Sequence, residues 1–139
     1  MDHETPFELD PRLVRDTVFV IDLVLCRVLL MNDRRYPWLI LVPRRTGVVE
    51  LTELAANDCQ QLWQESLQAA RLLKDEYPQG KLNMGSLGNV VSQLHLHLLM
   101  RQPEDPAWPG PVWGHSAAEP YAEGEVRSRV QQLRSWFQS

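Results

Sequence analysis

The chain has 139 residues and carries 14 lysines and arginines against 18 aspartates and glutamates, so its net charge is −4 at neutral pH. This length suits one hydrophobic core, and we expect residues 1–139 to form a single domain. An acidic chain lacks the basic surface needed for nucleic acid or an anionic membrane, so we exclude both as partners. The longest apolar stretch, Val18–Met31, contains two charges and is too short to span a membrane.

The N-terminus and the cysteines bear on the compartment. Met1–Glu4 has neither the positive charge nor the apolar run of a secretory signal, so we expect a cytoplasmic protein. Cys26 and Cys59 lie in apolar segments without a second cysteine or histidine at zinc spacing. We therefore interpret both as reduced core residues.

The first half of the chain predicts a short helix followed by strands. Asp10-Pro11 is a typical helix start, since proline is tolerated at the first helical position. Apolar, β-branched runs of strand length occupy Thr17–Asp22, Leu25–Met31 and Leu39–Val42, with the polar turn Asn32–Arg35 before the third.

A helical repeat then precedes two more strands. From Thr52, which we expect to cap the helix, apolar residues including Trp63 recur at helical spacing as far as Tyr77. Lys81–Met84 and Leu94–Met100 have the composition of strands. Strand runs around one long helix, without regular β-α-β alternation, predict an α+β fold with an antiparallel sheet of about five strands.

The C-terminal quarter combines a proline-rich loop with a second helix. Residues 102–114 hold four prolines and the indoles of Trp108 and Trp113, so no helix or central strand passes through them. The indoles have three open interpretations: covering a base, contacting a second subunit, or packing the last helix on the sheet. Ser116–Glu119 fits a capping box, and the apolar spacing of residues 126–137 predicts the C-terminal helix.

The most informative segment, residues 93–99, reads Gln-Leu-His-Leu-His-Leu-Leu. Alternate residues of a strand share a face, so Gln93, His95 and His97 should point outward together while the intervening leucines pack on the core. Three interpretations compete. The histidines are incidental, or they are two ligands of a metal whose other ligands have no spacing signature, or an imidazole acts as a nucleophile near neutral pH.

This segment resembles the signature of the histidine triad superfamily, His-φ-His-φ-His-φ-φ, where φ is an apolar residue. The resemblance extends from about Phe19 to Arg101 and includes the Val42-Pro43-Arg44 corner after a strand. It implies the histidine triad (HIT) fold and a homodimer. One position departs from the signature, because Gln93 stands where the family has its first histidine.

The resemblance also implies an activity: hydrolysis of phosphoanhydride or phosphoramidate bonds in dinucleoside polyphosphates or nucleoside phosphoramidates. By this resemblance His95 is the nucleophile, and His97 contacts the phosphate and the leaving group. Gln93 stands in for the first histidine in supporting the site, since an amide also donates and accepts. No cofactor and no metal are implied.

Three asparagines are assigned to a purine nucleotide substrate. The resemblance places Asn32 at the ribose, with the adjacent Asp33 as an alternative; both are also ordinary turn residues. It places Asn83 and Asn89 near the phosphate, and a plain loop amide is the alternative for Asn83. Two other functions stay open. One is a nucleotidyl transferase or phosphorylase, although those branches carry glutamine where this chain has His97; the other is a catalytically weak nucleotide-binding module, which Gln93 would mark.

Overall fold

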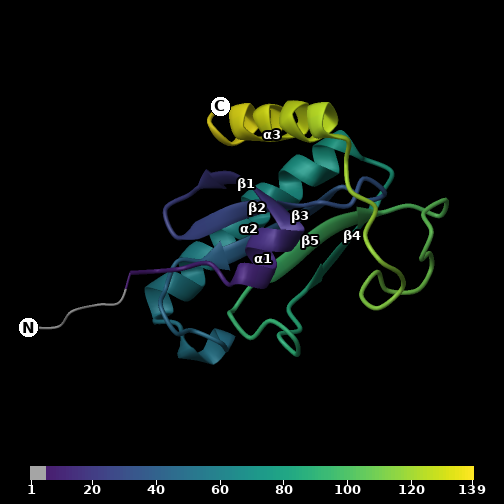
Figure 1. The fold of residues 1–139 in the computed structure, drawn as a ribbon. Coiled ribbons are helices and arrows are strands. Elements are labelled where there is room, and N and C mark those ends of the chain that lie inside the picture. Colours follow the sequence, from purple (N-terminus) through teal and green to yellow (C-terminus); the bar gives the residue numbers. More distant parts are fainter. Residues whose placement is uncertain (1–5) are drawn as a thin grey trace, which may run out of the picture.

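A five-stranded antiparallel sheet forms the centre of the structure, a computed structural model that describes residues 6–139 (Figure 1). Its strands lie in the order β1-β2-β3-β5-β4, and every neighbouring pair is antiparallel. The α+β fold and the five strands predicted from the sequence are confirmed. Their bounds are β1 (Thr17–Asp22), β2 (Cys26–Met31), β3 (Trp38–Pro43), β4 (Lys81–Gly85) and β5 (Leu96–Arg101).

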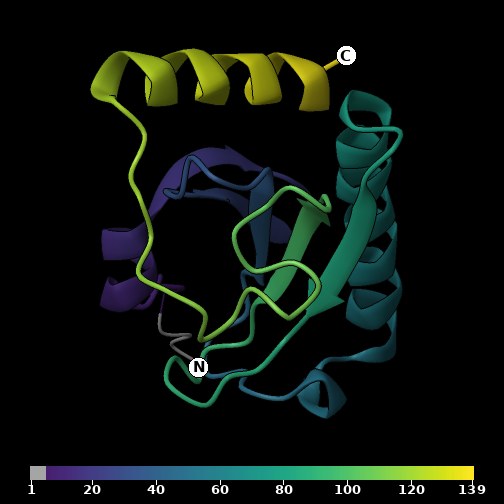
Figure 2. The ribbon, with the colours of Figure 1, turned by 90° about the vertical axis from the view of Figure 1, so that its right-hand side faces the viewer.

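Both faces of the sheet are covered, which explains why all six residues of β3 are buried. The long helix α2 (Ala56–Glu76) covers one face, and α3 (Glu123–Phe137) crosses one end of the molecule (Figure 2). Apolar residues of both helices share one core cluster with the sheet. The short helix α1 (Pro11–Asp16) lies over the opposite face, where a smaller cluster includes Leu13, Ile40 and Val112.

A buried carboxylate fixes α2 to the sheet. Glu65, only 3% exposed, accepts hydrogen bonds from the backbone N–H groups of Leu25 at 2.9 Å and Cys26 at 2.7 Å. The same carboxylate accepts from the Gln61 amide at 2.7 Å. These bonds satisfy backbone donors at the β1–β2 turn, which no strand partner reaches, and set where α2 crosses the sheet.

The start of α1 agrees with the sequence prediction, and the start of α2 does not. Asp10 caps α1 as expected, accepting from the Arg12 backbone N–H. Thr52 does not cap α2, however, because residues 51–53 form a separate 3₁₀ turn and α2 begins only at Ala56. The intervening Leu54 has an extended backbone and is 8% exposed in the core. Trp63, which the helical spacing placed inside, is 58% exposed.

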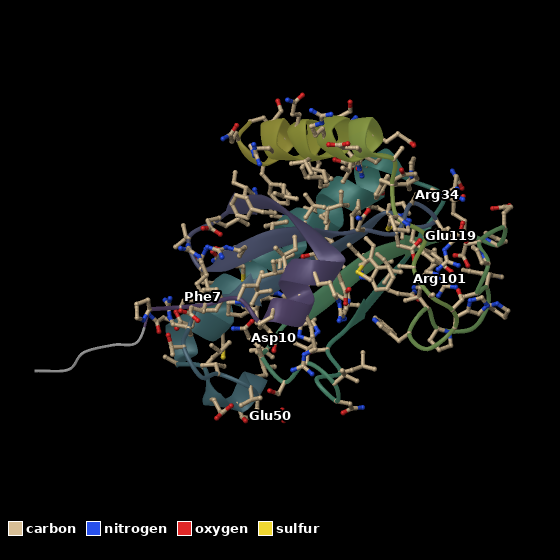
Figure 3. The ribbon with its side chains drawn as sticks, viewed as in Figure 1. Phe7, Asp10, Arg34, Glu50, Arg101 and Glu119 are labelled. Atoms are coloured by element: carbon tan, nitrogen blue, oxygen red, sulfur yellow. The ribbon has the colours of Figure 1, made fainter. Side chains whose placement is uncertain are left out.

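The capping box predicted at Ser116–Glu119 is wrong, because α3 begins at Glu123. Both polar side chains of that segment bind arginines of the β2–β3 turn instead. Arg35 donates to the Ser116 hydroxyl at 2.8 Å, and Arg34 donates to the Glu119 carboxylate at 2.6 Å (Figure 3). These contacts hold the segment against the sheet end rather than at a helix start.

Candidate active site

The two histidines lie where β5 begins. His97 is on the strand and His95 directly precedes it. The predicted alternation is confirmed, since Leu98 joins the α2-side core while His97 faces the other side of the sheet. The predicted exposure is wrong: His95 is 6% and His97 9% exposed. Their face is closed because the N-terminal segment and the proline-rich loop pack over it.

A backbone carbonyl fixes the protonation of His95. The Nδ1 atom of His95 lies 2.7 Å from the Gln93 carbonyl oxygen. A carbonyl oxygen only accepts, so Nδ1 must carry the hydrogen in this contact. In the neutral form of this ring the Nε2 atom carries the lone pair, and that is the form of imidazole that attacks an electrophile.

His97 has the opposite tautomer. The Trp38 indole donates its Nε1–H to Nδ1 of His97 at 3.0 Å, so the hydrogen of the neutral ring is on Nε2. Burial, and to a smaller extent the neighbouring His95, lowers the pKa of His97 to about 3. The ring centroids of the two histidines are 5.0 Å apart. A lone pair on one ring therefore sits beside an N–H donor on the other.

Sequence reasoning missed Trp38. It opens β3, and its role depends on the pairing of β3 with β5, which sets Ile40 opposite His97 and Trp38 opposite Leu99. An apolar run predicts a strand, but it does not show which residues of another strand pair with it. The only local signal is an indole, which needs a hydrogen-bond acceptor when buried, at the start of a wholly apolar strand.

Gln93 holds the N-terminal segment next to the histidines. Its side-chain amide donates to the Glu8 carbonyl oxygen at 2.8 Å and accepts from the Asp10 backbone N–H at 2.9 Å. Arg12 adds a second connection by donating to the Val90 carbonyl oxygen at 2.9 Å. Both polar ends of the Gln93 side chain are therefore engaged by backbone groups of residues 8–10.

Asp10, at the start of α1 (Figure 3), also lies beside Gln93, whose side-chain oxygen accepts from its backbone N–H. Hydrogen bonds from Arg12 are the largest cause that lowers the pKa of Asp10, and the charge of His95 also contributes. Asp10 is thus an anionic group near the His95 ring, and sequence reasoning identified it only as a helix cap.

The three asparagines are not brought into contact with the histidines. Asn83 lies on β4 two residues from Gly85, which pairs with His97. The side-chain oxygen Oδ1 of Asn83 accepts a hydrogen bond from Arg101 at 3.2 Å. Asn32 accepts from the Tyr121 backbone N–H at 3.0 Å. The exposed Asn89 precedes β5 and lines a cavity on the α2 side of the sheet, together with Gln93. Their roles toward a substrate stay predictions.

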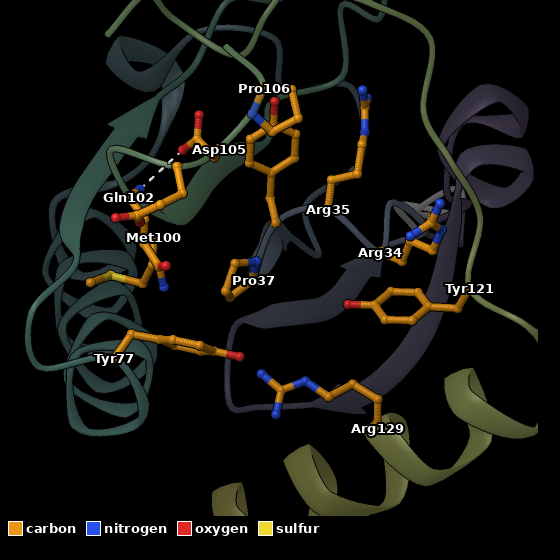
Figure 4. A pocket seen from close by; sticks show the side chains of 12 residues that line it. Arg34, Arg35, Pro37, Tyr77, Met100, Gln102, Asp105, Pro106, Tyr121 and Arg129 are labelled. Carbon is orange, nitrogen blue, oxygen red and sulfur yellow. Dashed lines mark hydrogen bonds between the residues drawn. The ribbon is translucent and has the colours of Figure 1, made fainter. Parts of the chain in front are cut away.

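A cavity of about 350 Å³ lies apart from the histidines, between the β2–β3 turn and the ends of α2 and α3 (Figure 4). The side chains of Tyr77, Tyr121 and Arg129 point into the same space. Arg129 is already paired with Glu76 through two hydrogen bonds of 2.7 and 2.8 Å. Neither histidine lines this cavity, so it is not part of the candidate active site.

Other reactive groups are inert or scattered. Cys26 and Cys59 are free thiols, and burial raises the pKa of Cys26 well above its ordinary value. Within residues 6–139, no three histidine, cysteine, aspartate or glutamate side chains gather closely enough to hold a metal ion.

None of the helices formed by residues 6–139 is long and apolar enough to cross a membrane. Residues 1–5, on which the expected compartment rests, lie outside the described part.

Comparison with known proteins finds a close set of structural relatives. A sequence model of the HIT domain matches residues 12–104. A histidine triad protein from Sinorhizobium meliloti is 46% identical, with 93% of this chain and 96% of that chain covered and a TM-score of 0.88. One from Marinobacter aquaeolei VT8 is 42% identical (95% and 96% covered, TM-score 0.91). One from Bradyrhizobium japonicum is 40% identical (94% and 98%, TM-score 0.89). No curated protein matches.

The lowered pKa of His97 predicts a pH-dependent stability. Between pH 6.5 and about pH 3 the unfolded chain binds a proton at His97 that the folded chain does not, so acidification lowers the free energy of unfolding. His97 alone contributes a slope of up to about 1.4 kcal/mol per pH unit. In His97→Asn this slope should disappear, as measured by urea unfolding at several pH values from about 5 to 7. Equal slopes in the two proteins would contradict the assignment.

The Gln93 contacts predict what holds the N-terminal segment. Gln93→Glu keeps the shape but replaces the N–H donor with an oxygen that faces the Glu8 carbonyl. We expect faster hydrogen exchange in residues 9–16 and a free energy of unfolding lower by about 1–3 kcal/mol. Gln60→Glu, an exposed change on α2, is the control. Unchanged exchange in the Gln93 variant would show that the amide does not hold this segment.

Proposed function

The chain belongs to the histidine triad (HIT) family, whose members are typically nucleotide hydrolases, and on that premise we propose that it hydrolyses nucleotides through His95. The observation that carries the proposal is the pair of complementary tautomers: a free lone pair on Nε2 of His95 beside an Nε2–H donor on His97. The substrates proposed are dinucleoside polyphosphates such as diadenosine tetraphosphate, or nucleoside phosphoramidates.

The first step is a displacement at the α-phosphorus. Nε2 of His95 forms a bond to phosphorus, and the bond from phosphorus to the leaving group breaks, with its electron pair departing on that group. The Nε2–H of His97 donates a hydrogen bond to the phosphoryl or leaving-group oxygen as charge develops. In the second step a water oxygen forms a bond to phosphorus, the P–N bond breaks with its electron pair returning to Nε2 of His95, and the nucleoside monophosphate and one proton of the water are released to solvent.

The protonation of His97 favours one substrate class. Its pKa of about 3 keeps the ring neutral near pH 7, so it donates a hydrogen bond but has no labile proton to transfer. A polyphosphate leaves as a stable anion without receiving a proton, whereas an amine leaving group needs one. We therefore propose phosphoanhydrides as the preferred substrates over phosphoramidates.

Gln93 has a positioning role in this proposal. Its side-chain amide is hydrogen-bonded to backbone groups of residues 8–10, and its backbone carbonyl oxygen sets the tautomer of His95. Asn83, the asparagine on the histidine face of the sheet, is proposed to reach the phosphate, and Asn32 and Asn89 to bind the remainder of the nucleotide. No cofactor takes part.

The proposal predicts a covalent adduct on His95. Wild type mixed briefly with diadenosine tetraphosphate or an adenosine phosphoramidate should show an adenylyl adduct by intact-protein mass spectrometry, or release AMP. His95→Ala and the more conservative His95→Gln should form no adduct and lose at least about 1,000-fold in rate. His115→Ala, a change of an exposed histidine outside the site, should behave as wild type. Circular dichroism of each variant controls for folding.

Four results of this experiment would contradict the proposal. Nucleotide binding without adduct or product identifies a binding module. Incorporation of added phosphate into the product identifies a phosphorylase, and transfer of the nucleotidyl group to another acceptor identifies a transferase. A product that forms equally well in both His95 variants would remove His95 from the reaction.

We also propose that the protein forms a homodimer through the β4 edge. β4 ends the sheet, and an edge strand presents unpaired backbone groups to another strand. Beside it lie the exposed apolar side chains of Met84 (39%), Leu87 (49%) and Trp63 (58%). An antiparallel edge is self-complementary about a two-fold axis, so a second copy of the chain is the fitting occupant.

The dimer proposal predicts a monomer when a charge is placed in this patch. Trp63→Glu should lower the mass measured by light scattering from that of a dimer to that of a monomer at micromolar concentration, because burying an unpaired carboxylate is costly. Val24→Glu, at an exposed site of the β1–β2 turn, should leave the mass unchanged. A monomeric wild type, or a dimeric Trp63→Glu protein, would contradict the proposal.

A further inference from the structure

Trp113 packs directly on His97. The chain leaves β5, runs through the proline-rich loop and returns across the histidine face of the sheet, where the Trp113 ring centroid lies 5.5 Å from that of His97 at an interplanar angle of 70°. The indole also contacts Gly85, the β4 residue that pairs with His97. A Cβ at Gly85 would come within 2.8 Å of Cη2 of the indole. The indole can therefore occupy this position only because residue 85 has no side chain.

The indole N–H of Trp113 is buried and has no hydrogen-bond partner. Among the described residues, Tyr36 has the only other buried side-chain polar atom in that condition. The contrast with Trp38 is direct, because the N–H of that indole is satisfied by His97 itself. Buried donors are nearly always paired in folded proteins, so an orphaned one next to reactive side chains indicates an acceptor that arrives with a ligand.

The loop that carries Trp113 is anchored at its base. Arg101, 1% exposed, forms two hydrogen bonds of 2.7 and 2.9 Å with the Asp105 carboxylate. That carboxylate also accepts from the backbone N–H groups of Gln102 and Trp108. Val112, directly before the indole, is buried in the cluster under the histidine face. The indole is therefore held in place from both sides.

We propose that Trp113 is a substrate-binding residue whose Nε1–H donates to an anionic oxygen of the phosphoryl or leaving group bound at His95 and His97. The inference rests on the proposed nucleotide function and identifies a second donor beside the Nε2–H of His97. An anionic oxygen fits best because a charged acceptor gives the stronger hydrogen bond in a buried setting. Gly85 is then a positioning residue, since it makes room for the indole.

Binding of AMP and of adenosine, which lacks the phosphate, tests the proposal by calorimetry. Trp113→Phe keeps an aromatic ring but removes the N–H, and should weaken AMP binding about 10- to 100-fold while leaving adenosine binding and the melting temperature unchanged. Trp108→Phe, which changes an indole that is 39% exposed in the same loop, is the matched control and should bind both ligands as wild type. Gly85→Ala should weaken AMP binding like Trp113→Phe.

A measurement on wild type guards against variants that fail to fold. In nitrogen-15 spectra the Trp113 indole signal, assigned by its loss in Trp113→Phe or by backbone assignment, should move on adding AMP or inorganic phosphate and not on adding adenosine.

Each alternative result is decisive. Three results would overturn the role of Trp113 and leave the proposed function standing. In the first, Trp113→Phe binds AMP with the affinity of wild type; in the second, it loses affinity for AMP and adenosine equally. In the third, the indole signal of AMP-bound wild type does not move. A wild type that binds no AMP overturns the proposed function and this inference with it.

Discussion

The pairing of β3 with β5 is the constraint on which the chemistry of the site depends. It brings the indole of Trp38 to Nδ1 of His97, which removes that nitrogen as a donor site and leaves the hydrogen on Nε2. His95 receives the opposite arrangement from the carbonyl oxygen two residues before it. The two adjacent rings thus differ in what their Nδ1 atoms face, a carbonyl oxygen at His95 and an indole N–H at His97. A nucleophile and a donor need this difference, and no charged group has to be buried to create it.

The features predicted correctly from the sequence are those set by short-range patterns. The apolar runs of the strands and the alternation around Leu98 follow from the period of two residues, and they hold in the structure. The burial of His95 and His97 was not predictable, because its cover comes from residues distant in the chain. The failed capping box at Ser116–Glu119 has a similar cause, since arginines of the β2–β3 turn compete for its side chains.

The departure at Gln93 has a physical explanation in the backbone it binds. An amide carries one acceptor and a donor on the same planar group, so it can bind a carbonyl oxygen and an N–H of one extended segment, as a neighbouring strand does. Gln93 makes this pair of bonds with residues 8 and 10. The side chain at the first position of the motif therefore belongs to the wall of the site, while its backbone carbonyl orients His95.

The sheet order also determines when the reactive pair can exist. Trp38 and His97 are 59 positions apart, and they meet only when β5 pairs with β3. An incomplete chain on the ribosome, or an intermediate in which only the β1–β2–β3 meander and the β4–β5 hairpin have formed, lacks the Trp38 hydrogen bond that sets the tautomer of His97. The pair of tautomers on which the proposed catalysis rests is thus created when β5 pairs with β3, and it is lost whenever β5 detaches.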